Sequence, residues 1–268
     1  MKNTALTIAG SDCSGGAGIQ ADIKTMEACG VYAMSVITAV TAQNTLGVQG
    51  VYPVSPACMR AQLESIFTDL APDAVKIGMM AEEELIRITA SCLKKEKVSH
   101  IVIDPVMISS SGTPLLEKGA RNCLMEELFP LAEVLTPNLP EAEELTGMEL
   151  SGKNTDEAWQ REQMETAAKR IYERYGCGVV LKGGHARGRA DDLLYLNGKA
   201  IWIPGKRIEN PNTHGTGCTF SSAIASGLAK GMDAEHSVRF AKEYIQRAIE
   251  AGLNLGRGNG PLEHSVWD

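Results

Sequence analysis

A chain of 268 residues with 44% hydrophobic residues can bury a large core, and we expect a single domain over residues 1–268. A net charge of −7 without a cluster of Lys and Arg argues against nucleic acid or an anionic membrane as a partner. Seven scattered cysteines with no C-x-x-C pair argue against a zinc site and fit a reducing compartment. Because no signal peptide and no stretch of membrane-spanning length is visible, we expect a cytoplasmic protein.

Apolar β-rich runs alternate with amphipathic stretches along the chain. The runs predict strands over 5–9, 34–40, 74–77, 101–103, 134–135 and 178–181. The amphipathic stretches predict helices over 17–29, 56–70, 82–95, 118–128, 139–145 and 156–175, with two more between 217 and 253. This alternation is typical of an α/β three-layer sandwich, in which helices cover both faces of a mostly parallel sheet. An antiparallel β-hairpin is predicted over 192–203, because two β-rich runs flank Asn197-Gly198 there.

Polar signatures recur directly after the predicted parallel strands. They are Gly10-Ser11-Asp12, Gln43-Asn44, Gly78-Met79, Asp104-Pro105, Thr136-Pro137-Asn138 and Lys182-Gly183-Gly184. The carboxyl ends of parallel strands meet at one edge of the sheet, where open α/β folds bind their ligands. We therefore expect the six segments to converge on one ligand-binding crevice.

The segment 212–219, with the sequence NTHGTGCT, runs straight into a small-residue helical stretch. Gly215 and Gly217 would let the backbone approach a phosphate, while the N–H groups and dipole of a helix start attract anions. The segment is therefore a candidate phosphoryl-transfer site. The alternative is an ordinary turn in which Cys218 is a small buried residue, and the segment alone does not decide between the two.

Two familiar nucleotide-binding motifs are matched only in part. Residues 147–153 match most of a P-loop, but Asn154 replaces the Ser or Thr that would hold magnesium, and the segment follows a helix. Residues 16–21 fit a relaxed dinucleotide fingerprint, but the next strand ends in Thr41-Ala42-Gln43 without a ribose-binding acid. We interpret the first as a loop, and we do not expect a nicotinamide or flavin dehydrogenase.

Phosphate binding would then depend on the 215–218 turn and on Lys182. The alternative for Lys182 is a solvated surface lysine, and its place between an apolar strand and two glycines argues against that alternative. Asp104, between a strand end and Pro105, could bind magnesium. Asn138 and Glu141 lie three residues apart at a helix start. They could organise a metal-bound water shell or form a helix-capping box, and the spacing alone favours the cap.

The sequence leaves two interpretations open for Cys218 and two for the loop 186–189. A helix start lowers the pKa of a thiol and a nearby phosphate raises it, so Cys218 is either the base for an attacking alcohol or a lining residue. The loop 186–189, with the sequence ARGR, is either a mobile flap whose arginines approach nucleotide phosphates or an exposed linker.

Seven blocks, in order along the whole chain, resemble the hydroxymethylpyrimidine/phosphomethylpyrimidine kinases of thiamine biosynthesis, within the ribokinase-like superfamily. The blocks are 5–12 (ALTIAGSD) with 14–22 (SGGAGIQAD), 40–45 (VTAQNT), 76–79 (KIGM), 104–107 (DPVM), 136–141 (TPNLPE), 182–185 (KGGH) and 213–219 (THGTGCT). The resemblance implies a ribokinase-like fold, ATP and Mg²⁺ as cofactors, and a homodimer. It further implies transfer of the ATP γ-phosphate to the 5-hydroxymethyl group of 4-amino-5-hydroxymethyl-2-methylpyrimidine, and a second transfer to the resulting monophosphate.

The resemblance also implies residue roles. Gln43 would read the pyrimidine edge, and its amide, with one donor and one acceptor group, complements an aminopyrimidine. The other substrate-binding residues would be Gly10, Asp22, Val40, Met79 and Val106. Cys218 stands where many relatives carry a catalytic Asp, and Gly215, Gly217 and Lys182 would complete the catalytic group. Asn138, Lys182, Gly183 and Thr216 would bind the nucleotide, and Asp104 and Glu141 the magnesium.

Two other functions compete with pyrimidine phosphorylation. A pyridoxal kinase of the same subfamily is the main alternative, because pyridoxal also carries a hydroxymethyl group on a flat nitrogen heterocycle. The intact block around Gln43 favours the pyrimidine. A non-catalytic ligand-binding domain on this fold would be expected to have lost Lys182, Glu141 or the glycine turn, and all three are present.

Overall fold

The computed structural model describes residues 2–107, 116, 118–150, 156–185 and 189–267. Its strands are β1 (Thr4–Asp12), β2 (Tyr32–Asn44), β3 (Gly47–Pro53), β4 (Ala74–Ile77), β5 (Ile101–Ile103), β6 (Val134–Leu135), β7 (Gly178–Leu181), β8 (Asp192–Leu196) and β9 (Lys199–Ile203). Within the described residues they form one nine-stranded sheet in the order β3-β2-β1-β4-β5-β6-β7-β8-β9. The parallel strands are β2, β1, β4, β5, β6 and β7. The edge strand β3 runs antiparallel to β2, and at the other edge β8 runs antiparallel to β7 and β9 antiparallel to β8.

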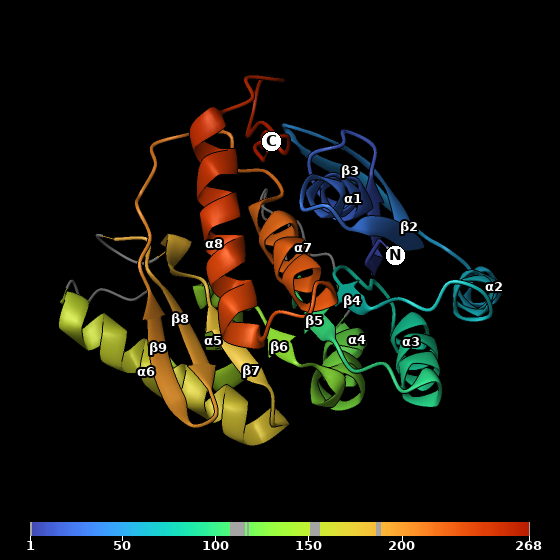
Figure 1. Ribbon diagram of the computed structural model, residues 1–268, viewed down its shortest axis with the longest axis horizontal. Helices are drawn as coiled ribbons and strands as arrows, with labels where there is room; N and C mark the ends of the chain where they lie inside the picture. Colours follow the sequence, from blue (N-terminus) through green and yellow to red (C-terminus); the bar gives the residue numbers. More distant parts are fainter. Residues whose placement is uncertain (1, 108–115, 117, 151–155, 186–188, 268) are drawn as a thin grey trace.

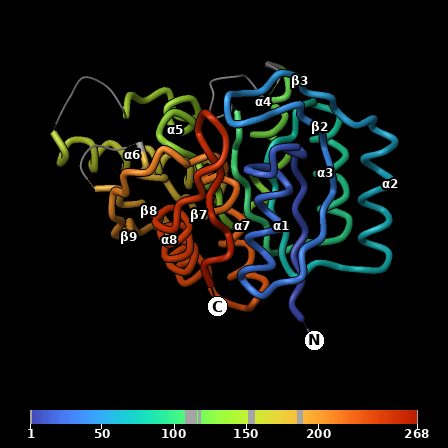
Figure 2. The backbone as a smooth tube through the Cα atoms, turned by 90° about the horizontal axis from the view of Figure 1, so that it is seen from above, coloured from blue at the N-terminus to red at the C-terminus, as the bar shows by residue number. Residues whose placement is uncertain are grey.

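Helices cover both faces of this sheet (Figure 1). They are α1 (Gly18–Ala28), α2 (Pro56–Phe67), α3 (Glu83–Glu96), α4 (Lys118–Cys123), α5 (Leu139–Thr146), α6 (Glu157–Tyr175), α7 (Thr216–Ala229) and α8 (Ala234–Ala251), and a π-helical stretch, Leu124–Leu128, follows α4. Helices α1, α7 and α8 lie on one face, and α2 to α6 lie on the other (Figure 2). Among the described helices, none combines the length and the apolar character that a membrane crossing requires.

Side-chain alternation along the strands builds two separate cores. On β7, Val180 belongs to the buried cluster that includes Phe220 of α7, whereas Val179 and Leu181 belong to the cluster that includes Met164 of α6. Successive residues of a strand point to opposite faces, so buried parallel strands must be apolar on both sides. The α/β three-layer sandwich, the mostly parallel sheet and the hairpin over 192–203 are therefore confirmed.

The first two strands differ from the prediction. β1 continues from residue 9 to Asp12 and β2 from residue 40 to Asn44, so the polar segments expected directly after these strands form their last residues. The unpredicted strand β3 explains this extension, because it pairs antiparallel with the last part of β2 from Ala39 to Asn44. Its sequence GVQGVYP contains two glycines and a proline, and none of its residues is fully buried, so it lacks the alternating pattern of a core strand.

Candidate active site

The start of helix α7 carries a turn that only glycine permits. Gly215 has a φ of 83°, and a Cβ there would lie 1.9 Å from the carbonyl oxygen of Gly16. A Cβ on Gly217 would lie 3.0 Å from Asp104 Oδ2 and 3.4 Å from Lys182 Nζ. The first N–H groups of a helix have no partner within the helix. The turn therefore presents backbone N–H donors, which an anion site requires. The Asp104 carboxylate and the Lys182 ammonium group lie directly beside these donors.

Lys182 and Asp104 form a buried ion pair between the ends of β7 and β5. The Lys182 Nζ donates to Asp104 Oδ1 at 2.7 Å, and the two side chains are 16% and 3% exposed. Thr136 also donates to this oxygen, at 3.1 Å. Burial alone would lower the pKa of Lys182, but the charges of Asp104 and Glu141 raise it above its usual value. The ammonium group is therefore charged at neutral pH, and its position suits a phosphate at the 215–218 turn.

Asn138 and Glu141 form the capping box that their spacing predicts at the start of α5. The Glu141 N–H donates to Asn138 Oδ1 and the Asn138 N–H donates to Glu141 Oε2, both at 2.8 Å. Burial raises the pKa of Glu141 to about 7, the charge of Lys182 opposes this rise, and the charge of Asp104 adds to it. The cap is thus confirmed, and the carboxyl group it holds lies in the electrostatic field of the Lys182–Asp104 pair.

The donors fit a magnesium ion that arrives with a nucleotide. Within the described part of the chain, no cluster of three or more His, Cys, Asp or Glu side chains could hold a metal by itself. Asp104 and Glu141 supply hard carboxylate oxygens beside the anion site. Mg²⁺ is typically held by one or two carboxylates together with water and substrate phosphates, so two carboxylates at this place suffice.

A second group of predicted residues lies at the ends of β1, β2 and β4. A Cβ on Gly10 would lie 3.1 Å from the sulfur of Met79, so the backbone of β1 and the Met79 side chain are in close contact. Thr38 of β2 anchors Met79 by donating to its carbonyl oxygen at 2.7 Å. Val40, on β2, is 47% exposed, and Val106 is partly buried after β5. These apolar side chains could line one wall of a site for a flat ring.

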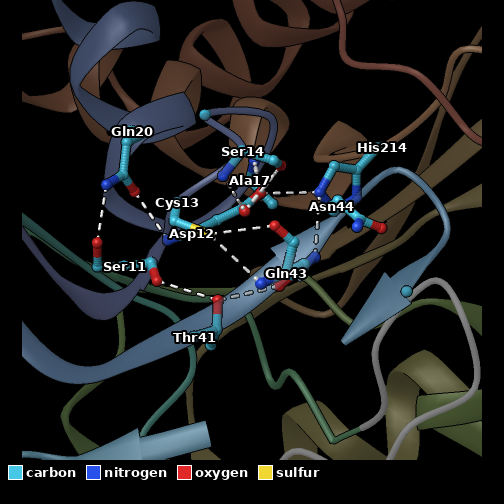
Figure 3. A network of polar contacts seen from close by, with 12 residues as sticks. Ser11, Asp12, Cys13, Ser14, Ala17, Gln20, Thr41, Gln43, Asn44 and His214 are labelled. Atoms are coloured by element: carbon cyan, nitrogen blue, oxygen red, sulfur yellow. Dashed lines mark hydrogen bonds and ion pairs between the residues drawn. The ribbon is translucent and has the colours of Figure 1, made fainter. Parts of the chain in front are cut away.

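Gln43 belongs to a polar network at the end of β2 (Figure 3). Its Nε2 lies 3.2 Å from Nε2 of His214, and its Oε1 lies 3.2 Å from the hydroxyl of Thr41. The backbone of Gln43 is also held, because the Cys13 thiol donates to its carbonyl oxygen at 3.1 Å. Gln43 is only partly buried.

Asp12 is the anionic centre of this network. Its carboxylate lies 2.9 Å from His214 Nε2 and accepts hydrogen bonds from the Ser14 N–H, the Ser14 hydroxyl and the Ala17 N–H at 2.8–3.0 Å. Burial alone would raise the pKa of Asp12, but the hydrogen bonds from His214 and Ser14 hold it below its usual value. The side chain is therefore a buried carboxylate.

Asp22 occupies a different environment from the one expected of a substrate contact. Its side chain and that of Lys76 are both 0% exposed and form an ion pair at 2.8 Å. Thr7 donates to Asp22 Oδ2 at 2.6 Å and Ser222 to Asp22 Oδ1 at 2.7 Å. A carboxylate with three protein partners and no exposed surface supports the site from below. Direct contact between Asp22 and the substrate stays a prediction that this geometry does not favour.

Cys218 lies at the first turn of α7, near both ion pairs. Burial raises the pKa of its thiol to about 11, although Lys76 lowers it, and Asp22 and Asp104 add to the rise. The effect of the helix start on this thiol is therefore outweighed by burial. A raised pKa favours the thiol form at neutral pH, which supports the interpretation of Cys218 as a lining residue over that of a thiolate base.

The remaining predicted nucleotide contacts are less direct. The Gly183 N–H donates to Asp192 Oδ1 at 2.7 Å, so this amide already has a partner. Lys242 holds the same carboxylate through Oδ2 at 2.7 Å and thereby fixes the loop after Lys182. The hydroxyl of Thr216 donates to the Thr213 carbonyl oxygen at 2.7 Å. Residues 186–188 of the expected flap and residues 151–153 of the P-loop-like segment lie outside the described residues.

The structure therefore brings most of the predicted residues to one end of α7 and adds three that the sequence analysis did not assign. These are Asp12, Lys76 and His214, all of which lie inside the matched sequence blocks. A histidine directly before a glycine turn is a signal for His214. No signal in the sequence pairs Lys76 with Asp22, because the contact joins strand β4 to helix α1, 54 residues apart in the chain.

The described fold is shared with solved kinases. Pyridoxal kinase of Bacillus subtilis, in an ADP complex, matches this chain with a TM-score of 0.88 at 38% identity, over 99% of this chain and 98% of that one. The sandwich and the glycine turn beside the Lys182–Asp104 pair define a kinase of the ribokinase-like class.

Sequence comparison then identifies the family within this class. The family model described as phosphomethylpyrimidine kinase matches residues 12–263, so the chain belongs to the phosphomethylpyrimidine kinase family. The hydroxymethylpyrimidine/phosphomethylpyrimidine kinase of Rhizobium meliloti is 48% identical over 267 residues, with 98% of this chain and 97% of that protein covered. The thiamine biosynthesis bifunctional protein ThiED of Geobacter sulfurreducens is 46% identical over 98% of this chain, which spans 52% of its length.

Proposed function

We propose that the protein transfers the γ-phosphate of ATP to the hydroxymethyl group of 4-amino-5-hydroxymethyl-2-methylpyrimidine, and then phosphorylates the monophosphate to the diphosphate used for thiamine. One observation carries this proposal. The start of α7 lies between two groups of opposite character: the Lys182–Asp104 pair beside Gly217 and the Gln43–His214 network before Gly215. A phosphate donor on the first side and a flat polar heterocycle on the second would place the reacting groups over the helix start.

The residues on the nucleotide side stabilise charge. Lys182 stays protonated and lies at the helix start, where backbone N–H groups and the helix dipole also attract a transferred phosphoryl group. Magnesium bound with ATP would neutralise phosphate charge, and Asp104 and Glu141 are the side chains placed to hold it. Phosphoryl transfer depends mostly on such positioning and charge stabilisation, so the protonated thiol of Cys218 does not prevent it.

On the acceptor side, Gln43 supplies the polar recognition and Gly10, Met79, Val40 and Val106 supply the surroundings. The missing Cβ of Gly10 lets the Met79 sulfur pack directly against the backbone of β1. An amide on one edge and apolar side chains near the ring faces suit a flat heterocycle with few polar groups. Nucleotide contacts by Asn138, Gly183 and Thr216 are part of this proposal, and for Gly183 they would not involve its N–H, which Asp192 occupies.

Pyridoxal phosphorylation is the second candidate, because the Bacillus subtilis pyridoxal kinase has the same fold over nearly the whole chain. The two activities are separated by measuring magnesium-dependent ADP release with hydroxymethylpyrimidine, its monophosphate and pyridoxal as acceptors. We expect kcat/KM for the pyrimidines to exceed that for pyridoxal by ~10-fold or more, because pyridoxal lacks the amine beside a ring nitrogen. A higher kcat/KM for pyridoxal would overturn the pyrimidine assignment.

A variant pair tests the site itself. Gln43→Ala should raise KM for the pyrimidine while leaving KM for ATP nearly unchanged, and Lys182→Met should mainly lower kcat. We further propose that the chain works as one kinase domain in the cytoplasm and as a homodimer. Sedimentation of the purified protein would test the dimer.

A further inference from the structure

Two polar groups, the Asp12 carboxylate and the Gln43 amide, lie close to the same ring nitrogen of His214. Its Nε2 lies 2.9 Å from Asp12 Oδ2 and 3.2 Å from Gln43 Nε2 (Figure 3). In the ring plane this nitrogen has either one hydrogen or one lone pair. A carboxylate only accepts hydrogen bonds and an amide NH₂ group only donates them. One nitrogen therefore cannot bond the carboxylate and the NH₂ group at the same time.

The contact with Asp12 decides where the hydrogen lies. Within the described part of the chain, the other hydrogen-bond partners of this carboxylate are donors: the Ser14 N–H, the Ser14 hydroxyl and the Ala17 N–H. Hydrogen bonds donated to a carboxylate favour its charged form, so these donors favour an ionised Asp12. A charge-assisted bond at 2.9 Å is stronger than a neutral one at 3.2 Å. His214 therefore carries its hydrogen on Nε2 and donates it to Asp12.

This hydrogen determines how the Gln43 amide must point. An Nε2–H group repels the amide NH₂ and attracts the amide oxygen. The Thr41 hydroxyl lies on the other side of the amide and has one hydrogen. Its oxygen lies 3.0 Å from the Ser11 carbonyl oxygen, which can only accept a hydrogen bond. If Thr41 donates to Ser11, its lone pair is free to accept from the Gln43 NH₂ group.

A half-turn of the terminal amide leaves its shape unchanged and satisfies all of these groups. The amide oxygen then shares the His214 hydrogen with Asp12, and one amide hydrogen goes to Thr41. One N–H and one oxygen lone pair of Gln43 remain for a ligand, in an order that the protein sets.

We propose that His214, held by Asp12, is a positioning residue that locks the direction of the Gln43 amide and thereby selects a 4-aminopyrimidine edge. This inference deepens the proposed function and rests on it. The 4-amino edge offers an N–H donor beside a ring-nitrogen acceptor, and the 4-oxo edge offers the reverse, an oxygen acceptor beside a ring N–H. For a ring bound in one orientation, an amide locked in one direction accepts only one of these two edges, and the aminopyrimidine of the proposed function makes it the first. An amide that is free to turn accepts both.

The decisive measurement is the ratio of kcat/KM for 4-amino- and 4-oxo-5-hydroxymethylpyrimidine. We expect the wild-type protein to prefer the amino compound by ~100-fold or more, because a mismatched edge leaves polar groups unpaired. In His214→Phe, which keeps a flat ring without nitrogens, the ratio should fall ~10-fold or more through KM for the two pyrimidines, while KM for ATP stays unchanged. Thr41→Val, which keeps the side-chain shape, should lower the ratio in the same direction by a smaller factor.

The outcomes separate this inference from the function on which it rests. If the wild-type protein phosphorylates neither pyrimidine, the proposed function falls and the inference falls with it. If Gln43→Ala abolishes selectivity but His214→Phe and Thr41→Val both fold and keep the wild-type ratio, only the inference is overturned. ¹⁵N NMR of labelled histidine in the wild-type protein gives a test without turnover: we expect the His214 hydrogen on Nε2, and a neutral ring with its hydrogen on Nδ1 would refute the lock.

Discussion

Replacing Lys76 by Met tests the ion pair that lies beneath the site. Lys76 Nζ lies 2.9 and 2.8 Å from the two oxygens of Asp22, and both side chains are fully buried. In Lys76→Met the carboxylate would remain in the core with only the hydroxyls of Thr7 and Ser222 as donors. Breaking a buried pair by removing one partner typically costs ~3–5 kcal/mol. For a chain of this size, this loss corresponds to a fall in Tm of ~6–20 °C.

Urea unfolding, followed by circular dichroism, measures this loss. The matched control is Lys2→Met, because Lys2 pairs with Glu27 at 3.0 Å with both side chains about half exposed, and such a pair contributes ~0–1 kcal/mol. The double variant Lys76→Met/Asp22→Asn removes the unpaired charge and should recover part of the free energy of unfolding. If Lys76→Met were within ~1 kcal/mol of the wild-type protein, the buried pair would not be a net determinant of stability.

Asp22→Asn, measured in the same experiment, separates support from substrate contact. A supporting role predicts lower stability with an unchanged KM for the pyrimidine in the folded fraction. A substrate contact predicts a raised KM beyond any loss of folded protein, and that result would restore Asp22 to the substrate-binding residues.

Two further predictions follow from buried titrating groups. Because burial raises the pKa of Cys218 to about 11, Cys218→Ala should lower kcat by less than ~10-fold, whereas a loss of ~10²–10⁴ at unchanged KM would identify a general base. Burial lowers the pKa of His264 to about 4, so the unfolded chain binds more protons between about pH 6.5 and pH 4, and stability is lost as the pH falls through this window. Urea unfolding should show a loss of ~2–3 kcal/mol from pH 7 to 4.5 that His264→Gln lacks, and equal losses in the two proteins would contradict this cause.

Much of the fold was predictable because its signals are local. The strands over 74–77, 101–103, 134–135 and 178–181 have the predicted bounds, since each is a short apolar run between polar segments. The hairpin bounds also agree, because Asn197-Gly198 specifies a tight turn. Strand β3 was missed because an exposed edge strand with glycines and a proline has no apolar face to reveal it.

The candidate site was predictable in its parts but not in its contacts. The glycine turn, Lys182, Asp104 and the capping box of α5 each follow from residue type and spacing. The ionisation of Cys218 and Glu141 could not be predicted, because burial and neighbouring charges set it and both depend on packing.

The sequence by itself determined the order and type of the elements, and it marked the helix start where a phosphate can bind, because hydrophobic period, turn residues and glycines act over a few neighbouring positions. Only the tertiary structure decided which polar groups meet. Lys182 is 78 residues from Asp104, and Gln43 is 171 residues from His214. These pairs form because parallel strands bring their carboxyl ends to one edge of the sheet, beside the start of α7, and no local pattern records that distance in space.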